Sequence, residues 1–504
     1  MIAFLLALAM VFVPLDDRPV TYQLPLMLGR IAGQPIVAPP RPLLGRYLHF
    51  GQPDAIIRWL NADAPRTDRY VLSSDMLAYG GLVASRVPGV TYDDAYFRLR
   101  ELDTLRQRSP RAWIGTFGTV MRLAPTGVPA IGDAASFFAA YPIWEYLQEY
   151  ANLHDPPSTE EAARAQVLAQ KIGPMALNGY LQARARNYAI DHLLIGMTAS
   201  GSIDRLVLGQ DDAKPYGLHV PELAALEVYA RQMQTGTRVS IQPGADELGM
   251  ALVAQGLARA GRWTPHVAVA YSRPDGASYQ DPLEFAPIGV TIKSLIALCG
   301  AVRDDDHPDF TLVVRVPSNG EALDAQLLAN LKQEAGAGKS IAFADLSFEQ
   351  NYEEQGAFAQ QLLQSGVASG LDAYSSWNTA ANTIGTALAE AIAANAGRRS
   401  HTYDRLAHET FTFMRFVDDV DFHVKVRPDL NAWLGGQDVD DHTYLLPDVA
   451  AQSAARNRDL LWSDAQQTLQ QLYPNLHIAA MNITLPWDRT FETQLDVSLA
   501  PNLP

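Results

Sequence analysis

The sequence predicts an α/β protein built from repeated strand and helix units. Short β-branched or apolar runs recur from about residue 9 to residue 377, and each is followed by a polar loop that often contains Gly or Pro. A longer segment with helical spacing then follows each loop. Such alternation implies parallel strands joined by right-handed helical crossovers. Because motif-bearing loops follow nearly every strand, a (β/α)-barrel-like core is favoured over an open doubly wound sheet.

Ten segments are predicted to be strands of this core. They are residues 10–14, 35–38, 69–73, 112–116, 205–208, 238–241, 266–270, 310–316, 340–344 and 371–374. Helical spacing extends over an unusually long segment between the fourth and fifth strands, so residues 137–199 are predicted to form a helical insertion. Residues 1–136 and 200–397 are predicted to form the α/β core. Residues 398–504 are predicted to form a C-terminal α+β cap, with helices near 403–416 and 451–472 and paired strands around 478–485 and 490–499.

Local signals place individual helices. Leucines at three-residue steps predict a helix over 93–108, and Pro110 closes it. Ser158 and Glu161 form a capping box that opens the helix containing residues 162–171. Phe138, Tyr141 and Trp144 share one helical face, which favours core packing over ligand stacking.

Composition limits the classes of partner. The 504 residues include 55 acidic and 39 basic side chains, for a net charge of -16. Because this charge repels polyanions, a nucleic-acid partner is not expected. A small-molecule or carbohydrate substrate is expected instead. The single cysteine, Cys299, excludes an intrachain disulfide and a cysteine-based zinc site.

The apolar start is too short to span a bilayer, and no other stretch reaches eighteen apolar residues, so no transmembrane segment is predicted. Residues 1–9 resemble a truncated signal peptide. Cytoplasmic and exported locations therefore both stay open. The oligomeric state is not predicted.

The loops after the predicted strands carry the candidate chemistry, because ligands bind at the carboxyl ends of strands in open α/β sheets and in barrels alike. The catalytic candidates are acidic: Asp16, Asp75, Asp211, Asp212, Asp246 and Glu247. The substrate-binding candidates are Asp17, Arg18, Tyr79, Arg122, Lys214, Tyr216, Trp377, Asn378, Asn382, Trp487, Arg489 and Glu492. Crowding of carboxylates at one end costs free energy and usually indicates a metal or catalysis.

Six motifs together resemble the bacterial DUF4127 family. They are PLDDRP, SSDMLAYGGLVASR, LGQDDAKPYGLH, GADELGMAL, SSWNTAANTIGTALA and PWDRTFE, and they run from near the N-terminus to about Glu492. The resemblance implies membership of the family. It implies no mechanism, because the family has no established activity.

Each motif also has a structural interpretation. Asp246 and Glu247 suit the positive end of a helix dipole, and Asn378 or Thr379 suits a helix N-cap. Gly80 and Gly81 suit a turn with positive φ. An internal ion pair is the structural alternative for the PLDDRP loop.

Three functions remain open. The first is a glycoside hydrolase-like enzyme, which needs one protonated and one ionised carboxyl. The second is a metal-dependent hydrolase in which Asp16, Asp75, Asp211 and Asp246 bind a divalent cation such as Mg²⁺. Apart from this possible cation, no cofactor is expected. The third is a non-catalytic protein that binds a carbohydrate or another small molecule. There is no GxxxxGK[ST], GxGxxG or GxSxG motif in the expected place.

Two contacts are expected. Asp211 or Asp212 should pair with Arg18, Arg122 or Lys214, because two neighbouring aspartates cannot both be buried without a cation. Trp487, Arg489 and Glu492 are expected to reach the same cleft as Asp75.

Overall fold

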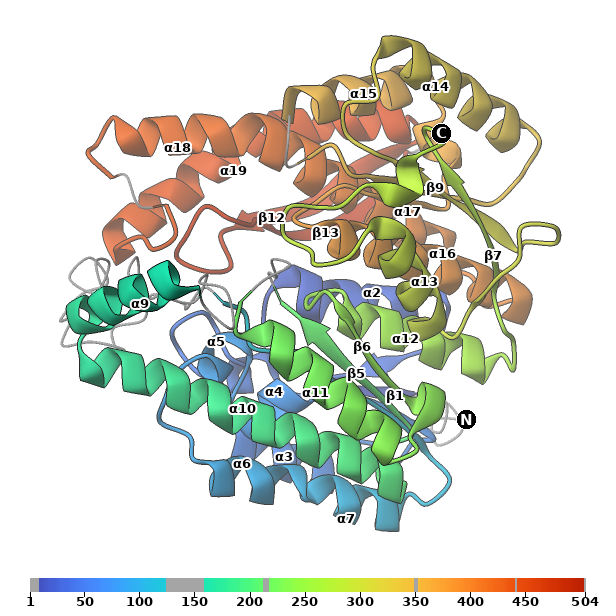
Figure 1. Ribbon diagram of the computed structural model, residues 1–504. Helices are drawn as coiled ribbons and strands as arrows, with labels where there is room; N and C mark the ends of the chain where they lie inside the picture. Colours follow the sequence, from blue (N-terminus) through green and yellow to red (C-terminus); the bar gives the residue numbers. More distant parts are fainter. Residues whose placement is uncertain (1–8, 124–157, 212–216, 349–351, 440–441, 503–504) are drawn as a thin grey trace. The chain divides into compact units, whose positions relative to one another are not determined.

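The computed structural model describes residues 9–123, 158–211, 217–348, 352–439 and 442–502 (Figure 1). The chain folds into two compact units. Unit 1 consists of residues 1–17, 36–249 and 280–286, and unit 2 of residues 18–35, 250–279 and 287–504. Each unit is built on its own sheet. The predicted boundaries at residues 136, 199 and 397 stay predictions.

Unit 1 contains a six-stranded parallel sheet. Its strands are β1 (Met10–Val13), β2 (Ile36–Val37), β3 (Arg69–Ser73), β4 (Trp113–Val120), β5 (Arg205–Gln210) and β6 (Val239–Pro243), in the order β2-β1-β3-β4-β5-β6. The register aligns Ser73 of β3 with Phe117 of β4, and Gly118 of β4 with Leu208 of β5. Phe12 and Phe117 stack in the core at 6.5 Å between ring centroids.

The helices of unit 1 are mostly short, apart from α9 (Thr159–Ile172), α10 (Pro174–Ser200) and α11 (His219–Gln232). The other helical segments are η2 (Arg41–Leu43), α3 (Pro53–Ala62), α4 (Ser74–Ala78), α5 (Leu82–Ser85), α6 (Tyr92–Leu99), α7 (Glu101–Arg108) and η4 (Gly236–Arg238). Helix α10 packs on β4 and β5 and runs alongside α11 (Figure 1). The chain then enters α12 (Leu248–Ala260), which begins in unit 1 and continues in unit 2.

The local helix predictions are largely confirmed. The Ser158 capping box is present, with the Ser158 N–H donating to Glu161 (2.8 Å) and the Glu161 N–H donating to Ser158 Oγ (3.2 Å). The single helix predicted over 93–108 is wrong in one respect, because it is divided at Arg100 into α6 and α7. The predicted aromatic face with Phe138 lies outside the described residues.

Unit 2 contains a second parallel sheet with the same strand arrangement. Its strands are β7 (His266–Tyr271), β8 (Val302–Arg303), β9 (Phe310–Arg315), β10 (Ile341–Asp345) and β11 (Ala373–Ser375), in the order β11-β10-β9-β7-β8. Numbered within each sheet, both follow the sequence 2-1-3-4-5, and unit 1 adds a sixth strand. This is the order of flavodoxin-like doubly wound sheets.

The predicted fold class is confirmed, and all ten predicted strands are present. The preference for a barrel is not confirmed, because the strands belong to two sheets and neither follows the sequential order of a (β/α) barrel. The sequence analysis missed β8, which has two exposed residues and therefore lacks an apolar run.

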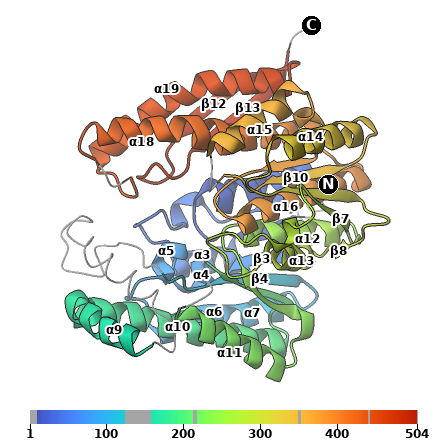
Figure 2. The same cartoon turned by 45° about the horizontal axis from the view of Figure 1, so that its top comes forward.

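The remaining elements of unit 2 are mainly helical. They are η1 (Pro19–Gln23), α2 (Leu24–Ile31), η5 (Gly276–Ser278), α13 (Ile288–Leu298), α14 (Glu321–Gly336), α15 (Tyr352–Gln364), η6 (Ala368–Gly370), α16 (Ala380–Ser400), α17 (Arg405–Phe416), η7 (Val417–Val426), α18 (Arg427–Gly435) and α19 (Pro447–Leu472). Helix α19 runs along an antiparallel pair, β12 (Leu476–Thr484) and β13 (Gln494–Pro501) (Figure 2). The predicted C-terminal helices and paired strands are thus confirmed.

Three further features bear on the predictions. Segments η1 and η7 are π-helical, a rare conformation that is frequent at functional sites. Cys299 is buried as a free thiol. Within the described ranges, no helix is both long enough and apolar enough to cross a membrane.

Candidate functional site

The carboxyl edge of the unit 1 sheet gathers most of the acidic candidates. The strand order makes β1, β3, β4, β5 and β6 successive neighbours. Asp16 follows β1, Asp75 follows β3, Asp211 follows β5, and Asp246 and Glu247 follow β6. Adjacent strands lie about 4.8 Å apart, so these loops line one continuous edge. The edge includes the β1/β3 switch point, where doubly wound sheets bind ligands.

One acid of this edge, Asp75, has a strongly raised pKa. It lies in the first turn of α4, whose N-cap is Ser73: the Ser73 hydroxyl accepts from the Met76 N–H at 3.2 Å. Asp75 Oδ2 accepts from the backbone N–H (2.8 Å) and the hydroxyl (3.2 Å) of Thr119 in β4. The residue is only 3% exposed. Burial raises the pKa of Asp75 to about 7, against the hydrogen bonds from Thr119 and the charge of Arg86.

Asp211 at the end of β5 has a different environment. It is 7% exposed and forms a buried ion pair with Arg86, which follows α5. Arg86 and Asp211 both influence the pKa of Asp75, Arg86 downward and Asp211 upward. One edge of the sheet therefore holds a carboxyl that is about half protonated near neutral pH and a carboxylate in an ion pair.

The expected cation partner is thus found, but it is one that the sequence analysis did not name. Arg86 pairs with Asp211, whereas Arg18, Arg122 and Lys214 were expected. Asp212, Lys214 and Tyr216 lie outside the described residues, so the expectations for them stay predictions. Of Arg122, the structure shows a half-buried side chain and a carbonyl that accepts from Arg184 at 3.3 Å.

The loop after β1 is held by contacts of Asp17 with Gly45 and Arg41, which include an ion pair between Arg41 and the Asp17 carboxylate (3.7 Å). The Asp17 N–H donates to the Gly45 carbonyl (3.1 Å), and Arg41 donates to the Asp17 carbonyl (2.9 Å). Gly81 has a φ of +118°, and a Cβ there would lie 3.1 Å from the Leu15 carbonyl oxygen. Gly81 therefore has the positive φ expected of it, and its missing side chain also allows the close approach between the loops after β3 and β1.

Helix α10 adds ionisable groups that the sequence analysis missed. The Arg186 guanidinium lies over the ring of Tyr79, 4.3 Å from its centroid, and donates to the carbonyls of Ser85 and Val87. Asp191 is buried, and its pKa is raised well above the usual range by burial and then by the charge of Asp75. Tyr79 is itself buried, with an arginine over its ring, so it is not an open platform for a sugar.

Arg184 on the same helix forms a bidentate ion pair with Glu222 of α11, at 2.8 and 2.7 Å. It also donates to the Met121 carbonyl just after β4 (3.1 Å). A signal for two of these residues exists in the sequence: Arg184 and Asp191 are seven residues apart, so they share one helical face with apolar residues such as Leu177 and Leu194. They lie within a helix, whereas the predicted site residues lie in loops after strands.

Glu247 has a local structural contact. Its Oε2 accepts from the Ala245 N–H at 3.1 Å, and the side chain is fully buried beneath its own turn. A Cβ on Gly244 would lie 1.8 Å from Glu247 Oε1. This geometry favours a role in shaping the turn before α12, as the dipole interpretation of Asp246 and Glu247 anticipated.

The SSWNTAANTIG motif lies in unit 2 at the start of α16. Thr379 is the N-cap, and its hydroxyl accepts from the Asn382 N–H at 3.3 Å. Asn378 donates to Asn382 Oδ1 (2.7 Å), and buried Trp377 donates from Nε1 to Thr386 Oγ1 (3.2 Å). These contacts cap and pack the helix, which agrees with the N-cap interpretation.

The PWDRTFE motif connects β12 and β13 in unit 2. Arg489 pairs with Glu492 and lies 4.5 Å from the centroid of the Trp487 ring. Arg18, the residue of the PLDDRP motif with which unit 2 begins, lies 4.8 Å from the centroid of that ring. The expectation that PWDRTFE shares a cleft with Asp75 stays a prediction.

Comparison with known proteins agrees with the resemblance of the motifs. A family model described as "Protein of unknown function (DUF4127)" matches residues 10–496. The chain belongs to the DUF4127 family. No curated protein and no solved structure matched it.

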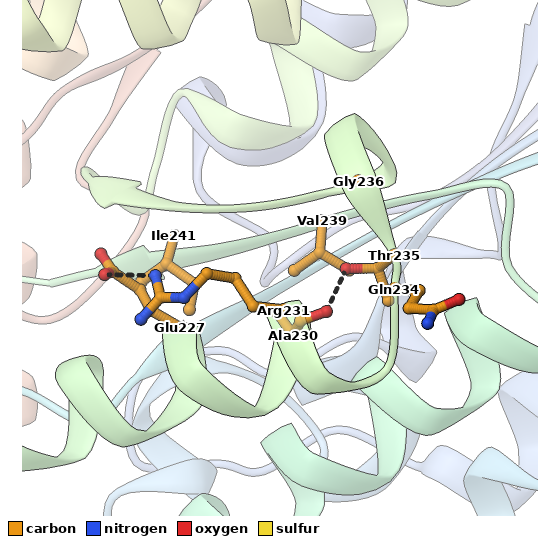
Figure 3. A pocket seen from close by; sticks show the side chains of 8 residues that line it. All are labelled: Glu227, Ala230, Arg231, Gln234, Thr235, Gly236, Val239 and Ile241. Carbon is orange, nitrogen blue, oxygen red and sulfur yellow. Dashed lines mark hydrogen bonds and ion pairs between the residues drawn. The ribbon is translucent and has the colours of Figure 1, made fainter.

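Two cavities of this DUF4127 chain lie apart from the acidic edge. One, of about 510 Å³, lies between α11 and the start of β6 (Figure 3). It is therefore at the amino-terminal end of that strand, away from the carboxyl edge. It is lined by Glu227, Ala230, Arg231, Gln234, Thr235, Gly236, Val239 and Ile241, and contains the ion pair of Arg231 and Glu227 (3.5 Å). The other, of about 580 Å³, lies in unit 2 among η1, α2, α17 and β13. None of the candidate residues lines either cavity.

Metal-ligand geometry is not seen in the described part of the chain. Within it, no three His, Cys, Asp or Glu side chains gather as a group that could hold a metal ion. Asp75 meets Thr119, Asp211 meets Arg86, and Glu247 meets a backbone N–H group.

Proposed function

We propose that this DUF4127 protein is an acid–base hydrolase of the glycoside hydrolase type, with its site at the carboxyl edge of the unit 1 sheet. Asp75 is the general acid. Asp211, held by Arg86, is the ionised partner that serves as base or nucleophile. The single observation that carries the proposal is the contrast between a buried carboxyl with a pKa of about 7 and a nearby carboxylate in an ion pair.

Hydrolysis of a glycosidic bond uses two carboxyl groups in different protonation states. It requires a proton for the leaving oxygen and a negative carboxylate for the sugar carbon or for an attacking water. Two acids with different environments at one site supply both states at the same pH. An acid with a pKa near the working pH is also the most effective proton donor. Thr119 orients Asp75, because both of its donors bind Oδ2.

The pH dependence follows from the state of Asp75. The acid must be protonated, so kcat/KM is expected to fall about tenfold per pH unit above a pH of about 7. A rate that rises through pH 7 and stays high would contradict the assignment of Asp75 as the acid.

The test is a turnover assay on 4-nitrophenyl glycosides and unlabelled oligosaccharides with three forms of the full chain. Asp75→Asn is nearly isosteric and is expected to reduce kcat by about 10²-fold or more. Asp68→Asn is the matched control, because Asp68 precedes the same strand at its opposite end and its side chain is 68% exposed. Turnover in Asp75→Asn equal to that of the control would remove Asp75 from the mechanism. A sugar that binds and is never cleaved would favour the non-catalytic alternative.

A further inference from the structure

Unit 2 contains a row of arginines and aromatic rings beside the π-helix η7. Arg18 and Arg489 both lie near the Trp487 ring, at 4.8 and 4.5 Å from its centroid. Arg489 and Arg427 both lie near the Phe491 ring, at 4.8 and 5.0 Å. Cation–π contacts of this kind hold guanidinium groups in place without neutralising them.

The arginines of this row differ in their ion-pair partners. Glu492 forms a bidentate ion pair with Arg489. Among the described residues, Arg427 has no carboxylate at ion-pair distance, although the charge of Glu492 acts on it. Its polar contacts include the His423 ring, at 3.4 Å from Nη1 to Nδ1, and a hydrogen bond with Tyr352. Behind it, Arg415 is bonded to both Asp418 and Asp419, so Arg427 lacks the carboxylate contact that Arg415 and Arg489 each have.

His423 cannot supply the missing negative charge. Arginine only donates hydrogen bonds, so the His423 Nδ1 facing Arg427 must be an acceptor and the proton of the neutral ring lies on Nε2. Burial lowers the pKa of His423 well below its usual range, and the charges of Arg427 and Arg415 act in the same direction. Burial also lowers the pKa of Arg427; Arg489 acts in the same direction, whereas Tyr352 and Glu492 act in the opposite direction. The His423 ring thus lies beside two positive charges in a protein of net charge -16.

We propose that Arg427, together with Arg489 and the ring of Phe491, forms a binding site for an oxyanion, that is, a carboxylate, sulfate or phosphate group of a ligand. A planar guanidinium presents paired N–H donors that match the two oxygens of such a group. The Arg427 side chain is half-buried, so its donors are held in place but are not sealed from solvent. The proposal is independent of the acid pair in unit 1, because all of its residues belong to unit 2.

The experiment measures anion binding to the full chain by calorimetry and by the rise in Tm. The probes are sodium phosphate, sodium sulfate and sodium glucuronate, each compared with sodium chloride at equal ionic strength. A ligand that binds only the folded state raises Tm in proportion to the logarithm of its concentration. The ranking of the three probes distinguishes a phosphate, sulfate or carboxylate source.

Two substitutions with opposite expected effects separate the proposal from damage to the fold. Arg427→Gln should weaken binding on the order of ten- to hundredfold, because one charge-assisted donor pair is lost. Glu492→Gln should tighten it, because the negative charge of Glu492, which acts on both Arg489 and Arg427 and repels an anion, is then removed. Arg405→Gln is the control, since Arg405 is exposed in the same unit and pairs with Glu409.

The outcomes are decisive in both directions. The proposal is overturned if none of the probes stabilises the wild-type protein more than chloride does. It is also overturned if wild type and Arg427→Gln bind the probes equally. If Arg427→Gln does not fold, Glu492→Gln decides: tighter binding supports the site, and unchanged or weaker binding overturns it.

Discussion

Asp75→Asn removes one titratable proton from the end of β3 and leaves the shape of the side chain nearly unchanged. In the folded protein the carboxyl has a pKa of about 7, compared with 3.8 for an unperturbed aspartate. At 1.36 kcal/mol per pKa unit, the difference corresponds to about 4 kcal/mol. The amide oxygen of asparagine can still accept from the Thr119 N–H, which donates at 2.8 Å to Oδ2 in the wild-type protein.

The sign of the effect follows from proton binding. Between pH 3.8 and about 7 the folded state retains a proton that the unfolded state has lost, so the stability from Asp75 is complete at low pH and disappears as pH rises through 7. Asparagine has no such dependence. The free energy of unfolding of Asp75→Asn minus that of wild type should therefore increase by about 4 kcal/mol between pH 4 and pH 8.

Urea unfolding, followed by circular dichroism at half-unit steps of pH, measures this difference. Asp68→Asn again serves as the control, because its exposed side chain should give a curve parallel to that of wild type.

Infrared difference spectra provide a second measurement. The carbonyl stretch of a protonated acid should disappear in wild type as pH rises through 7, and the part due to Asp75 should be missing from the variant at every pH. Parallel stability curves for wild type and Asp75→Asn would refute the reasoning, because they would mean that Asp75 titrates alike in the folded and unfolded states.

Two further predictions concern stability. Asp211→Asn removes the carboxylate of the buried ion pair with Arg86 and should lower the free energy of unfolding at pH 7 by about 3–5 kcal/mol. Asp211→Leu combined with Arg86→Met should recover most of that loss. A loss in the single variant below about 1 kcal/mol would show that the pair is not buried as described. Thr379→Ala removes the N-cap of α16 and should cost about 1 kcal/mol by urea unfolding, while Thr379→Ser, which keeps the accepting hydroxyl, should cost much less. Equal costs for the two Thr379 variants would contradict the capping role.

The sequence by itself determined the parts of the fold that depend on local signals. The ten predicted strands are all present because each is a short apolar run bounded by turn residues, and residues 69–73 match β3 at both ends. The capping box at Ser158 and the N-cap at Thr379 depend only on residues within one turn, so they too can be read from the chain. The motifs also determined the family, since their order along the chain is a property of sequence alone.

Only the tertiary structure decided how these elements combine. Strand order is set by hydrogen bonds between segments far apart in the chain, so the division into two sheets and the 2-1-3-4-5 order left no local trace. The partner of Asp211 was decided in the same way, because Arg86 lies 125 residues away and competes with other arginines of equal chemistry. Likewise, the pKa of Asp75 depends on how much protein excludes water around it, and that is a property of packing in three dimensions, as is the burial of Asp191 on α10.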